Sequence, residues 1–177
     1  MEFRYEIKIP KERIAVLVGI KGSVKRKIEK KLLIKMQINS DEGDIILIGN
    51  DSFNLLKAQN IVKAIGRGFN PNTAVDLANE NTALEIIDIT EYSGDSKKRL
   101  EQVKARAIGT GGKTRKIVSN LTDTDVVIYG KTVGLIGSYE GVKVARLAFE
   151  SLLSGSRHTT IYAWLEKEKK KSKGNIY

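Results

Sequence analysis

Two glycine-rich loops in this 177-residue chain have the residue types that bind phosphate. The first is Gly19-Ile20-Lys21-Gly22, and the second is Gly109-Thr110-Gly111-Gly112. Each is predicted to end one helix and begin the next, so that backbone N–H groups and the positive end of the helix dipole form an anion site. Glycine at both ends lets the backbone approach a phosphate without a Cβ in the way. These loops therefore suit the clamping of a phosphate backbone.

Basic side chains close to each loop add charge to the two predicted anion sites. Lys21 lies within the first loop and Lys113 directly follows the second, so each can make a charge-assisted contact to phosphate. One turn further along, Lys25 of the first copy corresponds to Arg115 of the second, with Lys116 beside it. Such a run usually forms a solvated helix face. The sequence leaves that interpretation and phosphate contact both open.

The Gly-x-x-Gly spacing alone carries little weight. Chance supplies about one match in a chain with 16 glycines. A third match, Gly134–Gly137, lies in a predicted strand and is interpreted as a strand end and turn. The other two matches differ because each joins two predicted helices within the same order of elements. That repeated setting is the informative signal.

The second loop also fits a rival motif. Residues 107–114 match the relaxed phosphate-loop pattern of nucleotide hydrolases. That motif requires a buried strand directly before it and a magnesium-holding acidic residue at the end of another strand. Here residues 97–106 are charged and helical in pattern. A nucleotide hydrolase is therefore the less favoured alternative, and no catalytic residue is predicted.

The loops belong to an internal repeat of about half the chain. The residues around the first loop match those around the second at an offset of 90, Leu47-Ile48-Gly49 matches Leu135-Ile136-Gly137 at 88, and the following helix matches at 87. Small changes of offset are what two copies of one fold with different loop lengths give. In the first copy we expect strands at 3–9, 32–39 and 45–48 and helices at 11–18, from 23 onward and at 52–65. The last of these helices is expected to have an apolar stripe through Phe53, Leu56, Ile61, Val62 and Ile65.

The second copy repeats this order with additions. We expect strands at 83–90, 125–129 and 132–136 and helices at 96–108, 113–121 and 140–153. Tyr92–Asp95 is predicted to be an inserted loop, and Asn70-Pro71 to open a short acidic helix between the copies. Residues 159–165 fit either an extra strand or the start of a helix, and residues 167–177 a frayed basic tail.

The order strand, helix, glycine loop, helix, two strands, helix resembles the KH domain. The predicted fold is α+β, with two tandem type I KH domains (β-α-α-β-β-α), each a three-stranded antiparallel sheet with three helices on one face. The predicted limits are 1–66 for the first domain, 67–82 for an acidic helical connector, 83–156 for the second domain and 157–177 for a C-terminal segment with the basic tail.

A KH domain clamps the backbone of single-stranded RNA with its glycine loop and lays the bases along an apolar groove. Apolar residues that could form the core or this groove are Ile28, Met36 and Ile38 in the first copy and Val118, Val127 and Ile128 in the second. The predicted RNA-binding residues are Gly19, Ile20, Lys21, Gly22, Lys25, Gly109, Thr110, Gly111, Gly112, Lys113, Arg115 and Lys116.

The composition agrees with a polyanion as ligand. The net charge is +10, and basic residues dominate 1–66, 96–156 and 157–177, whereas 67–95 is acidic. The chain has no cysteine and a single histidine, so neither a disulfide framework, a zinc site nor a histidine-centred triad is expected. No apolar run is long enough for a membrane span, and the N-terminal residues are unlike a signal peptide. We expect a cytoplasmic protein without metal, cofactor or membrane partner.

Beyond the general KH pattern, several segments are more specific: Lys113-Thr114, Leu135-Ile136-Gly137, Val144-Ala145-Arg146, Ile65–Phe69, Ser154-Gly155 and Ile161-Tyr162. Through them the chain resembles the Krr and partner-of-Nob group of KH proteins, which act in small-subunit ribosome biogenesis. The resemblance covers nearly the whole chain, and the compact length is similar to the archaeal form. Eukaryotic members have a degenerate first glycine loop, whereas this chain keeps its own.

The resemblance implies a non-catalytic protein that holds the 3′ end of small-subunit pre-rRNA for endonucleolytic maturation. The implied partners are that single-stranded rRNA, a Nob-type endonuclease, and translation or ribosome-assembly factors. A general KH module in RNA decay or translational control is the alternative function within RNA biology. Whether both domains bind RNA is left open by the sequence.

Overall fold

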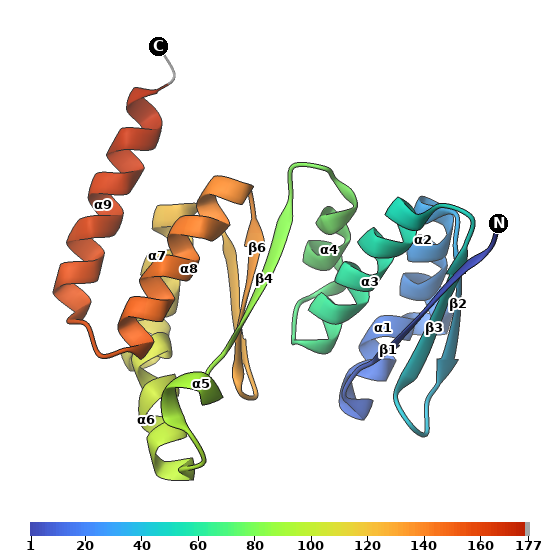
Figure 1. Cartoon of the computed structure of the whole chain (residues 1–177), viewed down its shortest axis with the longest axis horizontal. Helices are drawn as coiled ribbons and strands as arrows, with labels where there is room; N and C mark the ends of the chain where they lie inside the picture. The colour runs from blue at the N-terminus through green and yellow to red at the C-terminus, as the bar shows by residue number, and fades with distance from the viewer. Residues whose placement is uncertain (176–177) are drawn as a thin grey trace. The chain divides into compact units, whose positions relative to one another are not determined.

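The structure, a computed structural model, describes residues 1–175 of the 177-residue chain. It divides into two compact units, Met1–Thr82 and Ala83–Tyr177. Each unit contains one glycine loop and one three-stranded antiparallel sheet (Figure 1). The predicted α+β class and the doubled β-α-α-β-β-α order are confirmed. The finer limits of domains, connector and tail stay predictions.

The first unit is a sheet with strand order β1-β3-β2, covered by helices. Inward-facing residues of the central strand, such as Ile45 and Leu47, are fully buried, and the alternate residues are half-buried, as expected for a sheet with one covered face. Its strands are β1 (Phe3–Lys8), β2 (Lys35–Asn39) and β3 (Asp44–Gly49). Its helices are η1 (Lys11–Arg13), α1 (Ile14–Val18), η2 (Ile20–Gly22), α2 (Ser23–Leu32), α3 (Ser52–Gly66), α4 (Pro71–Ala74) and η3 (Val75–Ala78).

The second unit has the equivalent sheet order β4-β6-β5 and additional helices. Its strands are β4 (Ala83–Asp88), β5 (Asp125–Tyr129) and β6 (Thr132–Gly137). Its helices are α5 (Thr90–Ser93), α6 (Lys97–Ile108), η4 (Thr110–Gly112), α7 (Lys113–Thr122), α8 (Tyr139–Leu153) and α9 (His158–Gly174).

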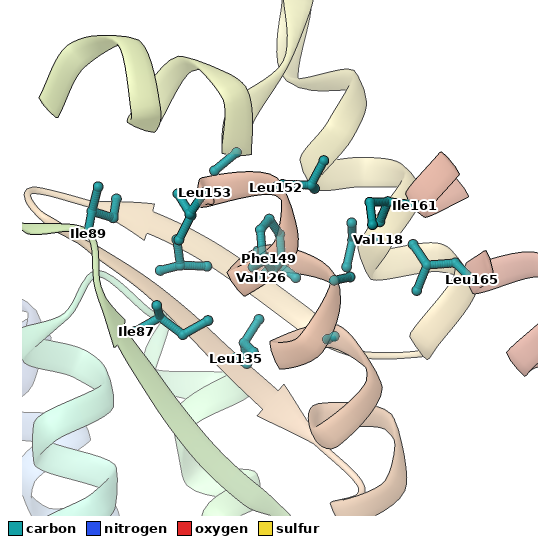
Figure 2. Close-up of a cluster of buried hydrophobic side chains, with 14 of the residues drawn as sticks. Ile87, Ile89, Val118, Val126, Leu135, Phe149, Leu152, Leu153, Ile161 and Leu165 are labelled. Atoms are coloured by element: carbon teal, nitrogen blue, oxygen red, sulfur yellow. The ribbon is translucent and has the colours of Figure 1, made fainter. Parts of the chain in front are cut away.

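The core of the second unit joins the sheet, α7, α8 and α9. Phe149 of α8 lies at its centre (Figure 2). Val126 and Leu135 of the sheet lie on one side of it, and Ile161 and Leu165 of α9 on the other. Ile161 and Leu165 reach this core from α9, one turn apart on the same side of that helix. The C-terminal helix is therefore part of the second hydrophobic core.

The connections explain the drifting offsets of the sequence repeat. Four residues, Ser40–Gly43, join β2 to β3, whereas only Gly130 and Lys131 join β5 to β6, and this lowers the offset from 90 to 88. Residues 50–51 precede α3, whereas Ser138 alone precedes α8, and this lowers it to 87. The two units are thus copies of one fold with shortened connections.

Two predictions about segments of the second unit are wrong. Residues 158–174 form helix α9, so the described part of the predicted frayed tail is helical, because its first two turns are anchored in the core; residues 176–177 lie outside the described residues. The predicted loop Tyr92–Asp95 begins within the short helix α5. Asp88, the last residue of β4, stabilises the turn into that helix, since its carboxylate accepts from both the N–H and the hydroxyl of Thr90.

The apolar stripe of α3 also differs from the prediction. Phe53 and Leu56 were expected inside, but their side chains are 74% and 51% exposed. Ile61, Val62 and Ile65 are buried as predicted. Toward the start of the helix the buried face continues through Leu55 and Ala58, not through Phe53 and Leu56. Leu55 and Leu56 are adjacent and both apolar, so the sequence alone does not fix which of them faces the core.

Candidate nucleic-acid interface

The two glycine loops have the same backbone conformation. Gly19 and Gly109 both have φ of 74°, with ψ of 176° and 169°. At the third position Lys21 and Gly111 are both left-handed, with φ of 53° and 60°. In each loop the N–H of the last glycine donates to the C=O of the first at 3.1 Å. The sequence repeat is therefore a repeat in geometry, and its third position accepts a lysine.

The first position of each loop requires glycine for two reasons. A φ of 74° is unfavourable for residues with a Cβ. In addition, a Cβ on Gly19 would lie 2.6 Å from Val24 Cγ2 and 2.8 Å from Val24 N, and one on Gly109 would lie 2.7 Å from Thr114 N. By contrast, nothing lies within 4 Å of the Cβ position at the third and fourth residues of the second loop. The fold fixes the first glycine, and the rest of the second loop is open to a ligand.

Helices α2 and α7 begin at these loops without a side-chain cap. Their N-caps are Gly22 and Gly112, and neither helix has an acidic residue in its first turn. In α3, α6 and α8 the side chains of Asp51, Ser96 and Ser138 accept from first-turn N–H groups. The first N–H groups of α2 and α7 therefore have no side-chain acceptor and remain available to an anion.

The side chains around the loops are open to solvent. Ile20 is 85% exposed, and Lys21, Thr110, Lys113 and Lys116 are exposed as well. The structure thus places the residues of the first loop at the start of α2 and those of the second loop at the start of α7. Lys113 and Lys116 lie in the first turns of α7. Their contact with RNA stays a prediction.

A small groove adjoins the second loop. It encloses about 280 Å³ and is lined by the last residue of α6, Ile108, by Arg115 of α7 and by Val126, Val127 and Ile128 of the edge strand β5. Arg115 Nη1 donates to the Val126 C=O at 3.3 Å, so the guanidinium lies across the groove against the strand. The groove combines apolar walls with one cation, which is the kind of surface on which bases bind.

The first loop adjoins a groove of a different make-up. It encloses about 430 Å³ beside Gly19 and is lined mainly by η1 and α1, including Lys11, Ile14 and Val18. The predicted contact residue Lys25 lies on α2, with its Nζ 4.0 Å from the carboxylate of Glu29. Glu29 in turn accepts the backbone N–H of Met36, on the edge strand β2, at 2.8 Å.

The structure separates core residues from groove residues among the apolar positions named in the sequence. Ile28, Met36 and Val118 are almost fully buried and belong to the cores. Val127 and Ile128 are half-buried and line the groove of the second unit. Sequence periodicity did not separate these groups, because the burial of a residue on the edge strand β5 depends on which helices pack beside it.

Sequence reasoning missed the support that α9 gives to the second loop. Thr114, in the first turn of α7, is buried, and its hydroxyl lies 2.8 Å from the hydroxyl of Tyr162. His158 Nε2 lies 3.0 Å from the C=O of Arg106 in α6, and its ring meets the ring of Tyr162 edge-on. The i, i+4 pair Ile161 and Leu165 was the available signal for a core-packed helix.

A second feature missed from sequence is an arginine in each unit that ties the helical segment before the glycine loop to the helix that follows the third strand, α3 in the first unit and α8 in the second. Arg13 donates to the C=O groups of Ile65 and Phe69 at 2.7 and 2.9 Å. Arg106 donates to the C=O of Leu152 at 2.9 Å and also to the C=O of Ser156. Each guanidinium thereby satisfies carbonyl groups at a helix C-terminus.

Arg146, named in the sequence resemblance, has a structural role. Its guanidinium bonds Glu150 at 2.7 Å and Glu85 of β4 at 2.9 Å, and so joins α8 to the sheet. The hydrogen bond to Glu150, with the charge of Glu85, raises the pKa of Arg146 above its ordinary value. Burial, together with the charge of Glu150, raises the pKa of the neighbouring Tyr92.

The phosphate-loop alternative does not fit this architecture. The second loop follows helix α6, not a strand, and the sheet beside it is antiparallel. Within residues 1–175, no three His, Asp or Glu side chains come together as a metal site.

The helices of residues 1–175 include none with the length and apolar character needed to cross a bilayer.

Comparisons with known proteins agree with the geometry of the second unit. Residues 83–170 match a family model described as the second KH domain of PNO1, a eukaryotic-type KH domain of type I. The matched range includes α9 up to residue 170. Helix α9, which packs on α7 and α8, therefore begins within the domain that the family model describes.

Relatives match between 61% and 96% of the chain. A KH domain-containing protein of Methanocaldococcus jannaschii is 43% identical over an alignment of 171 residues, and the match covers 94% of this chain and 74% of that protein. The RNA-binding protein PNO1 of Oryzias latipes is 31% identical, but the match covers 61% of this chain and only 45% of the fish protein. The pre-rRNA-processing protein pno1 of Schizosaccharomyces pombe is 25% identical over 96% of this chain and 73% of its own length.

Solved structures give the same family. Dim2p of Pyrococcus horikoshii is 40% identical, with a TM-score of 0.86 over 93% of this chain and 99% of that one. A structure of an a/eIF2alpha–aDim2p–rRNA complex from the same organism matches with a TM-score of 0.88 and 40% identity over 96% of each chain. These names support the partner-of-Nob part of the predicted resemblance, and the Krr name is set aside. The chain belongs to the PNO1/Dim2 family of RNA-binding KH-domain proteins.

Proposed function

We propose that this chain holds single-stranded RNA at the 3′ end of small-subunit pre-rRNA and presents it for processing without catalysing a reaction itself. The observation that carries the proposal is the pair of helix starts at Gly22 and Gly112, which lack side-chain caps and are surrounded by exposed cations. The relatives' names support the rRNA target, since they include a pre-rRNA-processing protein and an rRNA complex.

Within this proposal the second loop is the principal clamp. It has Lys113 directly after it and an apolar groove with Arg115 beside it, and α9 supports its helix. The first loop, with Lys21 and Lys25, assists. The RNA-binding set is therefore the predicted one: Gly19–Gly22 with Lys25, and Gly109–Lys113 with Arg115 and Lys116.

The proposed partners are proteins that act on the same RNA end. A Nob-type endonuclease would cut the RNA that the chain holds. The a/eIF2α subunit in the complex of the Pyrococcus relative supports a translation factor as a further partner. The expected location is the cytoplasm. The proposed domain limits remain 1–66 and 83–156, with a connector at 67–82 and a C-terminal segment from 157.

The clamp is tested by placing two carboxylates in each loop of the full chain. The double substitution Thr110→Asp and Gly111→Asp should strongly weaken binding to single-stranded RNA, and Ile20→Asp with Lys21→Asp should weaken it less. The matched control is Lys30→Asp, near the far end of α2, which lowers the net charge by two, as the Thr110→Asp and Gly111→Asp pair does. Unchanged circular dichroism must accompany the loss, and equal loss in the control would contradict a local clamp.

The target is tested by competition. RNA with the 3′-terminal sequence of small-subunit rRNA should displace a bound RNA probe better than unrelated single-stranded RNA of the same length does. Both RNAs are compared at the same salt concentration. Equal competition by both RNAs would instead favour the general KH module in RNA decay or translational control.

A further inference from the structure

The two edge strands present the same backbone position to the helix that follows each glycine loop. Met36 is the second residue of β2 and pairs with Leu47, and Val126 is the second residue of β5 and pairs with Leu135. Both are bonded by a side chain of the helix that follows the loop. In an antiparallel edge strand, the N–H and C=O of such a residue point away from the neighbouring strand. These positions are therefore where a base can reach the backbone.

In the first unit a carboxylate occupies this position. Glu29 Oε1 accepts the N–H of Met36 at 2.8 Å, and the Glu29 side chain is only 24% exposed. The Nζ of Lys25 lies 4.0 Å from the same oxygen, at the limit of an ion pair. The donor of the strand edge is thus already bonded within the protein, and a negative charge lies beside it.

In the second unit the same position is occupied by a cation. The residue that corresponds to Glu29 is Ser119, whose hydroxyl donates to the C=O of Thr124 and not to the edge strand. The residue that corresponds to Lys25 is Arg115, which donates to the Val126 C=O at 3.3 Å. A guanidinium has five N–H donors, so others remain for acceptors on a base.

We propose that Glu29 keeps bases away from the edge strand β2 of the first domain, so that Gly19–Gly22 holds RNA phosphate without reading sequence while the second domain reads the bases. A carboxylate repels both phosphate and base carbonyl oxygens, and it removes the backbone donor at Met36. The inference rests on the proposed function and assigns Glu29 as the residue that divides the work between the domains.

The test isolates each domain within the full chain. With the second loop silenced by Thr110→Asp and Gly111→Asp, binding to short homopolymers of A, C and U should be weak and about equal. Adding Glu29→Ser, the residue of the second copy, should raise affinity for at least one homopolymer about fivefold or more and create a base preference. Glu29→Gln keeps an acceptor for Met36 but removes the charge, so it should give part of this gain.

The reciprocal change has a matched control. With the first loop silenced by Ile20→Asp and Lys21→Asp, Ser119→Glu should flatten the base preference of the second domain. Ser119→Ala loses the same hydrogen bond to Thr124 without adding charge and should keep the preference.

Two results would overturn the inference. One is a silenced chain that already discriminates among the homopolymers with Glu29 in place. The other is a folded Glu29→Ser chain with unchanged affinity and no preference. If the unmodified chain binds none of the RNAs, the proposed function itself fails, and that outcome is distinct from either of these.

Discussion

The hydroxyl of Tyr162 lies 2.8 Å from the hydroxyl of Thr114 and joins helix α9 to the first turn of α7, directly behind the second glycine loop. Thr114 is buried, and its backbone N lies 2.7 Å from where a Cβ on Gly109 would be. The loop, the start of α7 and the C-terminal helix therefore form one packed unit. A change in α9 is expected to reach the clamp through this contact.

Tyr162→Phe tests that connection. The substitution leaves the buried Thr114 hydroxyl without this partner and should lower the free energy of unfolding by about 1 kcal/mol. It should also weaken RNA binding by the second loop. Urea unfolding and RNA titration measure the two effects, with Tyr5→Phe in the first unit as control. A stability loss with unchanged RNA affinity would limit α9 to a structural role.

The third position of the second loop should accept a lysine. Gly111 has φ of 60°, and Lys21 already has φ of 53° at the matching position. Because the space around Gly111 is open, Gly111→Lys should fold normally and add one phosphate contact. The slope of log affinity against log salt should then steepen by about 0.7. An unchanged slope would mean that this position does not face phosphate.

The first position of the same loop should not accept even alanine. Gly109→Ala places a Cβ against Thr114 at positive φ and should destabilise the second unit and weaken RNA binding. The matched change is Gly112→Ala, which has positive φ but open space, and should cost less stability. Thermal unfolding of the two variants compares them, and equal midpoints would contradict the steric argument.

The two arginine ties should act on their own units. Arg13→Met and Arg106→Met keep an aliphatic stem but remove hydrogen bonds from a charged donor, and each should cost about 1.5–3 kcal/mol. Hydrogen exchange should increase around α3 in the first variant and around α8 in the second. Arg4→Met, on the exposed part of β1, serves as control. Increased exchange of both units in both variants would argue against local ties.

Helix α9 should contribute to stability through its core residues. Leu165 is fully buried, so Leu165→Ala should lower the free energy of unfolding of the second unit by about 2–5 kcal/mol. Leu147→Ala, at a position 45% exposed on α8, should change it by less than about 0.5 kcal/mol. Chemical denaturation separates these cases, and equal effects would mean that α9 does not share the core.

The order of elements, the two loops and their shared architecture were determined by local sequence. Alternation in strands such as β1 depends only on neighbours, and glycine at 19 and 109 is required by a backbone angle and one nearby residue. Such features recur wherever the local sequence recurs, and for this reason the repeat could be predicted from the sequence alone.

Contacts between distant residues were decided only by the tertiary structure. The pairing of Tyr162 with Thr114, of Arg106 with Leu152 and of Glu29 with the edge strand depends on how helices and strands pack, and no periodicity encodes it. Helix α9 shows this most clearly, because its lysine-rich second half is typical of a solvated tail, and burial of Ile161 and Leu165 in a core built by other elements fixes it as a helix.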